Sequence, residues 1–205
     1  GQYQALNTPG TRAGQQIVAV GHQAGHIAMA TQAIAIGAQA GYCGQSQDAV
    51  AMGYQAGRNT QGQDAVAVGH QAGYTTQAGL AVAVGHQSGQ TQQGPAATAV
   101  GYRAGRSGQS QGAVAVGNSS GGTSQGQDAV AVGLQAGRNT QGQDAVAVGH
   151  DAGNTNQGSA AIAIGLSAGL TGQGEYAIAL GSDAGRTTQG LYAVAIGYDA
   201  ASNSQ

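Results

Sequence analysis

The chain has 205 residues, of which 39 are glycine and only 7% are charged, and its formal net charge is −2. It has no Trp, Phe or Lys, which excludes a thick core of large side chains. Its six arginines are too scattered to form a basic stripe, so we expect no nucleic-acid partner.

The first 16 residues resemble the rest of the chain only weakly. Gly1-Gln2-Tyr3-Gln4 stands where later repeats carry an apolar strand. Terminal units of repeat proteins are atypical because one face has no neighbour. We therefore predict that residues 1–16 form a degenerate N-terminal capping unit.

Residues 17–205 contain twelve copies of one 16-residue unit, without insertion or deletion. Each unit contains a pentapeptide such as Ala129-Val130-Ala131-Val132-Gly133, whose last residue we call the closing glycine. A fixed period of this length predicts stacked structural units around a common core. The strict period argues against disorder, and no linker divides the repeats, so we expect a single domain.

The pentapeptide predicts a short β-strand, because large aliphatic and small residues alternate with a period of two. The residue two before the closing glycine is always Ala, as at Ala131. Both faces of the strand are apolar, so we expect it to be covered on both sides. One side takes Val or Ile, and the other takes only Ala, so another backbone must approach it closely.

The rest of each unit is rich in glycine, which excludes helices. Glycine recurs four residues after the closing glycine in eleven units, and Gln recurs eight residues after it in eleven units. We interpret the glycines as turn positions and the Gln row as structural, with amides bonded to one another along the axis. The predicted fold is an all-β parallel β-roll or β-solenoid of 16-residue coils. At about 4.8 Å per coil, it would be a rod roughly 55–60 Å long.

The repeated unit resembles the YadA-like head repeats of trimeric autotransporter adhesins. The residues that carry the likeness are Val-Ala-Val-Gly at 130–133, Ala136-Gly137 and their equivalents in all twelve units. Similar repeats occur in fibre proteins of bacteriophages and large DNA viruses. The resemblance implies a left-handed coil, a homotrimer and an extracellular location on a bacterial cell surface or a virion.

Histidine and tyrosine recur directly after the closing glycine, and variable polar residues recur two and five positions after it. We expect these rows on the outer surface, where they would form a contact ladder for a host-surface protein or glycan. The candidate contact residues are Tyr54, His70, His86, Tyr102, His150, Arg58 and Arg138.

Sites of other kinds are not indicated. The histidines alternate with Tyr and Leu in one register, which favours a surface ladder over a metal site. Asp48, Asp64, Asp128 and Asp144 precede strands and are interpreted as solvated turn residues. Ser, His and Asp all belong to repeat registers, so we predict no enzyme, no cofactor and no metal. Cys43 is the only cysteine and forms no internal disulfide.

The sequence leaves two functions open. The first is a structural or adhesive fibre segment that mediates attachment. The alternative is an ice-binding solenoid that uses Thr and Asn rows six and seven residues after the closing glycine, as at Thr75 and Thr76. No apolar run reaches the roughly 18 residues of a membrane helix, and no secretory signal is recognised. Because the chain starts at Gly1, we expect it to be part of a longer protein.

Overall fold

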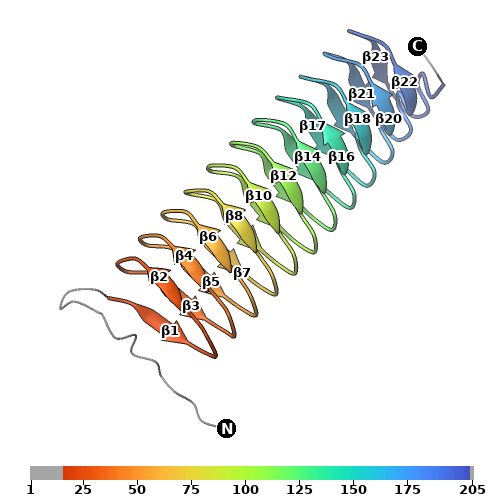
Figure 1. Cartoon of the computed structure of the whole chain (residues 1–205). Helices are drawn as coiled ribbons and strands as arrows, with labels where there is room; N and C mark the ends of the chain where they lie inside the picture. Colours follow the sequence, from red (N-terminus) through yellow and green to blue (C-terminus); the bar gives the residue numbers. More distant parts are fainter. Residues whose placement is uncertain (1–15, 204–205) are drawn as a thin grey trace.

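The computed structural model describes residues 16–203, which form a β-solenoid with two short strands in almost every coil (Figure 1). The predicted all-β parallel solenoid with a 16-residue period is confirmed. Apart from Gln16, the predicted capping unit at residues 1–16 lies outside the described residues.

The apolar pentapeptides form sheet A, a 12-stranded parallel sheet. Its strands, in spatial order, are β1 Val18–Val20, β3 Ile34–Ile36, β5 Val50–Met52, β7 Val66–Val68, β9 Val82–Val84, β11 Thr98–Val100, β13 Val114–Val116, β15 Val130–Val132, β17 Val146–Val148, β19 Ile162–Ile164, β21 Ile178–Leu180 and β23 Val194–Ile196.

The second wall is sheet B, an 11-stranded parallel sheet. Its strands are β2 Ile27–Met29, β4 Cys43–Gln45, β6 Asn59–Gln61, β8 Thr75–Gln77, β10 Thr91–Gln93, β12 Ser107–Gln109, β14 Thr123–Gln125, β16 Asn139–Gln141, β18 Thr155–Gln157, β20 Thr171–Gln173 and β22 Thr187–Gln189.

The strand pairing repeats the sequence period without a slip. In sheet A, Val130 pairs with Val146 and Val132 pairs with Val148, an offset of one unit. In sheet B, Gln141 pairs with Gln157 in the same way. A slip of one residue would exchange the inward and outward side chains of a strand, so the Ala/Val alternation fixes this register.

The interior is narrow and is filled by small side chains. In one coil, Ala129 just before β15, Ala131 within it and Ala136 in the following turn are fully buried. The Ala face of sheet A therefore points inward, where the opposite wall approaches closely. This is the close approach that the invariant Ala predicts.

The inward residue of sheet B is glutamine, and its amide bridges the two walls. Gln141 Nε2 donates to the carbonyl oxygens of Val130 at 2.8 Å and Ala145 at 3.1 Å. The same pair of bonds recurs at every other interior glutamine from Gln45 to Gln189, whereas the first coil has Met29 at this position. Among the described residues, a bond between two interior amides is found only from Gln157 to Gln173 (3.2 Å). The predicted axial bonding of this Gln row is therefore wrong, because the backbone carbonyls of sheet A take the amide hydrogens.

Two glycine positions show why the turns exclude a side chain. Gly133 has φ of +131°, and a Cβ there would lie 2.5 Å from the carbonyl oxygen of Gly149. Gly137 has φ of +52°, and a Cβ would lie 2.6 Å from Gln141 Oε1 inside the roll. The glycine rows therefore permit both the left-handed backbone and the tight spacing of the coils.

Three further positions of the repeat adopt positive φ, and in most coils residues other than glycine occupy them. In one coil they are Gln135 (φ 56°), Thr140 (φ 54°) and Asp144 (φ 56°). Asp and Asn tolerate this region better than most residues, which fits the repeated Asp before the strand. Asp144 is exposed in its turn, as expected.

Candidate functional surfaces

The outer face of sheet A is an apolar stripe that runs the length of the solenoid. It consists of the first and third residue of every strand in the sheet, all of them large and aliphatic except Thr98. Val130 and Val132 are half-buried in the middle of the rod, and Ile196 near its end is 63% exposed. Cover is therefore shown on the Ala side, and within residues 16–203 no segment of the same chain lies over the Val and Ile side.

The outer face of sheet B is polar by contrast. It carries Thr, Asn, Ser and Gln, and the Thr rows predicted for an ice-binding face lie here. Several of the Thr hydroxyls face backbone carbonyls of the next coil, as from Thr187 to Ser202 at 2.9 Å and from Thr123 to Arg138 at 3.3 Å. In the register of Thr75, the strands of sheet B carry residues other than Thr at Ile27, Cys43, Asn59, Ser107 and Asn139.

Four of the predicted contact residues form a continuous ring stack. Tyr54 and His70 have ring centroids 5.2 Å apart, His70 and His86 are 4.7 Å apart and nearly parallel, and His86 and Tyr102 are 5.3 Å apart. All four side chains are exposed. The structure thus brings together Tyr54, His70, His86 and Tyr102, which occupy one register on successive coils.

A ladder of hydrogen-bonded glutamine side chains runs beside the ring stack. The sequence predicted such a ladder for the interior row eight residues after the closing glycine, but it lies in a surface row. The side chain of Gln39 donates to Gln23 at 3.0 Å, and Gln55 donates to Gln39 at 2.7 Å. Gln71 continues the ladder by donating to Gln55 at 2.9 Å. These residues lie two positions after the closing glycine, on the surface, where no backbone carbonyl competes for the amide.

Arg58 belongs to a second row, five residues after the closing glycine. Its guanidinium lies 5.5 Å from the ring centroids of both Tyr42 and Tyr74, and its Nη1 donates to the Tyr74 hydroxyl at 2.5 Å. Tyr42 also stacks on His26 at 5.2 Å. Tyr42 and Tyr74 were not among the predicted contact residues. They share the register of Arg58 on the two adjacent coils, which could have indicated that the three side chains lie together.

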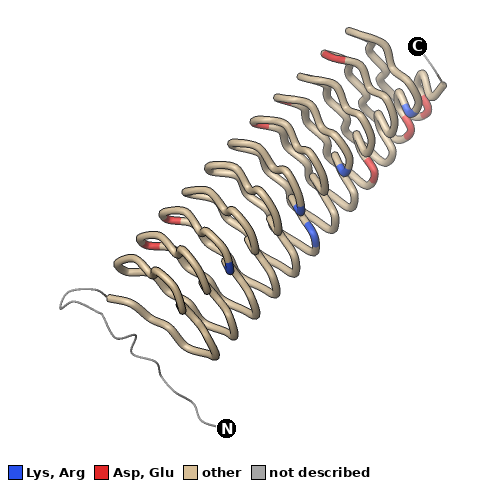
Figure 2. The backbone as a smooth tube through the Cα atoms, viewed as in Figure 1, with Lys and Arg blue, Asp and Glu red and all other residues tan. Residues whose placement is uncertain are grey.

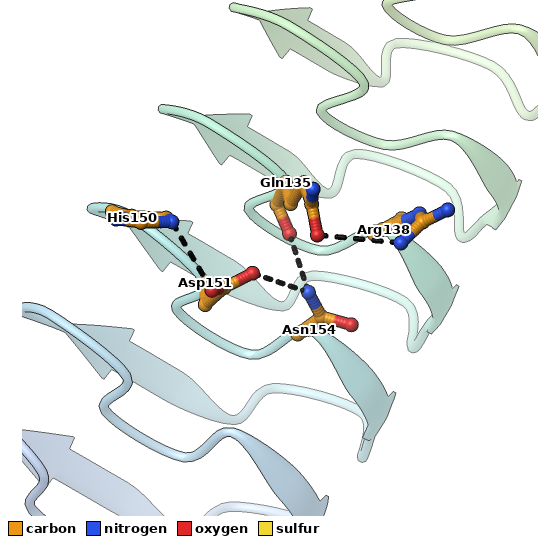
Figure 3. Close-up of polar contacts among 5 residues, drawn as sticks. All are labelled: Gln135, Arg138, His150, Asp151 and Asn154. Atoms are coloured by element: carbon orange, nitrogen blue, oxygen red, sulfur yellow. Dashed lines mark hydrogen bonds and ion pairs between the residues drawn. The ribbon is translucent and has the colours of Figure 1, made fainter.

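His150 and Arg138 lie in neighbouring coils, away from the ring stack (Figure 3). His150 Nε2 is 3.2 Å from Asp151 Oδ2, and Asn154 donates to the other oxygen of Asp151 at 2.7 Å. Arg138 donates to Gln135 Oε1 at 3.3 Å. The predicted ladder is therefore divided, because Asn118 and Leu134 interrupt the ring row between Tyr102 and His150.

The charged residues separate to opposite edges in the first two thirds of the rod (Figure 2). Asp48, Asp64, Asp128 and Asp144 lie in the turns that lead into sheet A, and the arginines within residues 16–203 lie in the turns that leave it. Among residues 16–203 no three His, Cys, Asp or Glu side chains gather as a metal site would require. In the same range no helix is long and apolar enough to cross a membrane.

Comparisons of the chain with models of protein families, with curated proteins and with solved structures found no significant match.

Proposed function

We propose that the chain is a non-enzymatic structural and adhesive segment of a fibre or surface head, which assembles as a homotrimer and mediates attachment. The observation that carries this proposal is the outer face of sheet A. A row of half-buried and exposed apolar side chains along a whole rod is an unusual surface for an isolated solenoid.

The shape of this face favours copies of the same chain as its cover. Twelve strands at about 4.8 Å give a stripe roughly 55 Å long. The side chains in it repeat every coil, so a second copy in the same direction and register offers an equally periodic apolar surface. Cyclic symmetry would leave all ends pointing the same way, as a projecting fibre needs. The number of three copies and the left-handed coil rest on the resemblance to YadA-like heads.

The edge that carries the ring stack supports the adhesive part of the proposal. Tyr54, His70, His86 and Tyr102 are exposed on the turns that leave sheet A, so they stay accessible when the apolar stripe is covered. Aromatic side chains with polar tips are common anchors at protein interfaces. In this proposal the segment works outside the cell, on a bacterial or virion surface, and contacts a host protein or glycan.

An attachment assay tests the adhesive role. Beads coated with the full chain are applied to an array of printed glycans and extracellular matrix proteins, beside beads that carry His70→Ala/His86→Ala. The proposal expects binding to at least one component and its reduction by the double substitution. Equal binding by both kinds of beads, or binding to nothing on the array, would contradict an adhesive ring stack.

The alternative, ice binding, stays a prediction about the outer face of sheet B. Hydroxyls that donate to carbonyls of the next coil are less available to order a plane of water, and the Thr rows are interrupted. We therefore expect no thermal hysteresis beyond that of an unrelated protein at equal concentration. Faceted ice growth at micromolar protein would favour the alternative.

A further inference from the structure

A hollow of about 120 Å³ opens on the same edge of the solenoid, just beyond the ring stack. Its lining includes Arg103, Arg106 and Arg138 together with Gly122 and Ser119. We propose that this arginine hollow binds an oxyanion, such as a sulfate, phosphate or carboxylate group. This proposal does not depend on the trimer or on adhesion.

The hollow lies beside a coil that lacks a side chain in one surface row. Gly122 lies five residues after its closing glycine, in the row that carries Arg106 one coil earlier and Arg138 one coil later. Every other coil has a side chain at this position. Gly122 is buried, and Arg138 Cγ lies 3.5 Å from the position that a Cβ would take there. The hollow that the arginines border is well above the roughly 10–15 Å³ that one water requires.

The three guanidinium groups each use one hydrogen bond to a neutral amide. Arg103 Nε donates to Gln87 at 3.0 Å, Arg106 Nε donates to Gln90 at 3.2 Å, and Arg138 Nη1 donates to Gln135. Each guanidinium has five N–H donors, so several remain for a ligand. The amides hold the arginines in place without neutralising their charge.

The charges at the hollow are not balanced by carboxylates. Within residues 16–203, ion pairs within 4.0 Å involve only His150 with Asp151 and Arg186 with Asp183. The closest acidic residue in the same turns, Asp151, lies one coil beyond Arg138 and is engaged by His150 and Asn154. Three like charges around one space repel one another, and a bound anion would relieve that repulsion.

The donors favour an oxygen ligand. Guanidinium groups match sulfate, phosphate and carboxylate groups through paired N–H···O bonds. Ser119 and Thr123 also line the space, but the Ser119 hydroxyl donates to Asn118 Oδ1 at 2.9 Å and the Thr123 hydroxyl to the carbonyl oxygen of Arg138 at 3.3 Å, so the guanidinium groups supply the free donors. Arg186 belongs to the same row and provides a natural comparison, because its guanidinium is already paired with Asp183 at 3.6 Å.

Titration of the full chain with sodium sulfate at low ionic strength tests the proposal. The protein carries ¹⁵N-labelled arginine, and the Nε–H resonances are followed by NMR. We expect saturable shifts for Arg103, Arg106 and Arg138, and little change for Arg58 and Arg186. Parallel, unsaturated shifts of all the arginines would overturn the proposal, since they would report a diffuse ion atmosphere.

Gly122→Leu closes the hollow without changing the charge. Leu170 occupies the equivalent position in another coil. A Cβ at Gly122 would lie 3.2 Å from the carbonyl oxygen of Arg138, so a small local shift makes room for the side chain. We expect sulfate affinity to fall by about tenfold or more. Arg106→Gln should weaken binding as well, and Arg186→Gln should not. Unchanged affinity in Gly122→Leu and Arg106→Gln, with native circular dichroism, would contradict the site.

A second arm identifies the source of the anion. Inorganic phosphate and a sulfated disaccharide are titrated under the same conditions. Tighter binding of the disaccharide than of free sulfate supports a site for acidic glycans, and equal binding supports a site for the free ion. If neither probe binds at millimolar concentration, the oxyanion site does not exist.

Discussion

Sheet A and sheet B enclose the same narrow interior, but they turn different side chains outward. Sheet A presents Val and Ile, and sheet B presents Thr, Asn, Ser and Gln. Inside, fully buried Ala131 faces a wall that contributes the buried Gln141. The inner faces therefore hold the coil together. The outer faces differ in polarity, and the folding of a single chain does not require its outer face to be apolar. The apolar outer face of sheet A is the one that points to a partner.

The largest expected effect comes from deletions that exchange the two walls. Removing residues 134–149 deletes one strand from each sheet and joins Gly133 to His150 in register, so a cooperative β fold should persist. Removing residues 134–141 places every later sheet A strand on the sheet B side, which misdirects its side chains. Circular dichroism melting of both variants distinguishes them. Indistinguishable melting curves would contradict the two-wall coil.

Overpacking the inner face of sheet A should have the next largest effect. Ala131→Leu adds three carbons to a fully buried site, and Gly137, Gln141 and Ala136 leave no space for them. Overpacking costs about 1–3 kcal/mol per site, and roughly three times that in a trimer. Thermal or chemical unfolding measures the loss.

The matched control for this substitution is Val132→Leu on the outer face of the same strand. Leu180 occupies the equivalent position in another coil, so the free energy of unfolding should change little. Equal stability of Ala131→Leu and Val132→Leu would show that the Ala face is not closely packed.

Removing one interior amide should have a moderate effect. Gln141→Met keeps a long side chain, and Met29 occupies the same register in the first coil. The variant loses the donors to Val130 O and Ala145 O, so we expect a cost of about 1–3 kcal/mol. Gln143→Met, on an exposed turn residue, is the control. Unfolding in denaturant should separate the two, and no difference would mean that the amide bridge is not stabilising.

A charge on the apolar stripe should have the smallest effect on folding. Its effect on assembly should be large. Val132→Asp should leave the coil folded, because the side chain points outward, but it should prevent the stripe from being covered. Thr140→Asp places the same charge on the outer face of sheet B and should leave assembly unchanged. Sedimentation velocity compares the two variants. Identical sedimentation would mean that the two outer faces do not differ in function.

The sequence predicted the period, the parallel strands and the small-residue interior, because each of these follows from residues in strict registers. It also placed His70 and His86 in one register on adjacent coils, where their rings stack at 4.7 Å. Their contact role stays a prediction. It did not predict the partners of the interior glutamines. Periodicity shows which rows exist, but the partner of Gln141 depends on how close the opposite wall lies.

The arginine hollow was missed for a related reason. Of its three arginines, only Arg138 was a candidate contact residue, and Gly122 looked like one more glycine in a chain with 39. The feature that could have indicated the site is Gly122 itself, because every other coil has a side chain five residues after its closing glycine. Departures from a repeat mark its special sites better than the consensus does, and the surface next to Gly122 illustrates this.

The mass of the isolated chain in solution tests the proposed interface on sheet A most directly. One chain has a mass of 19.8 kDa. Light scattering coupled to size exclusion should give about 60 kDa, because a trimer covers the outer face of sheet A with further copies of itself. A monodisperse species of one chain mass, stable across micromolar concentrations, would show that the apolar stripe tolerates water and would contradict the proposed interface.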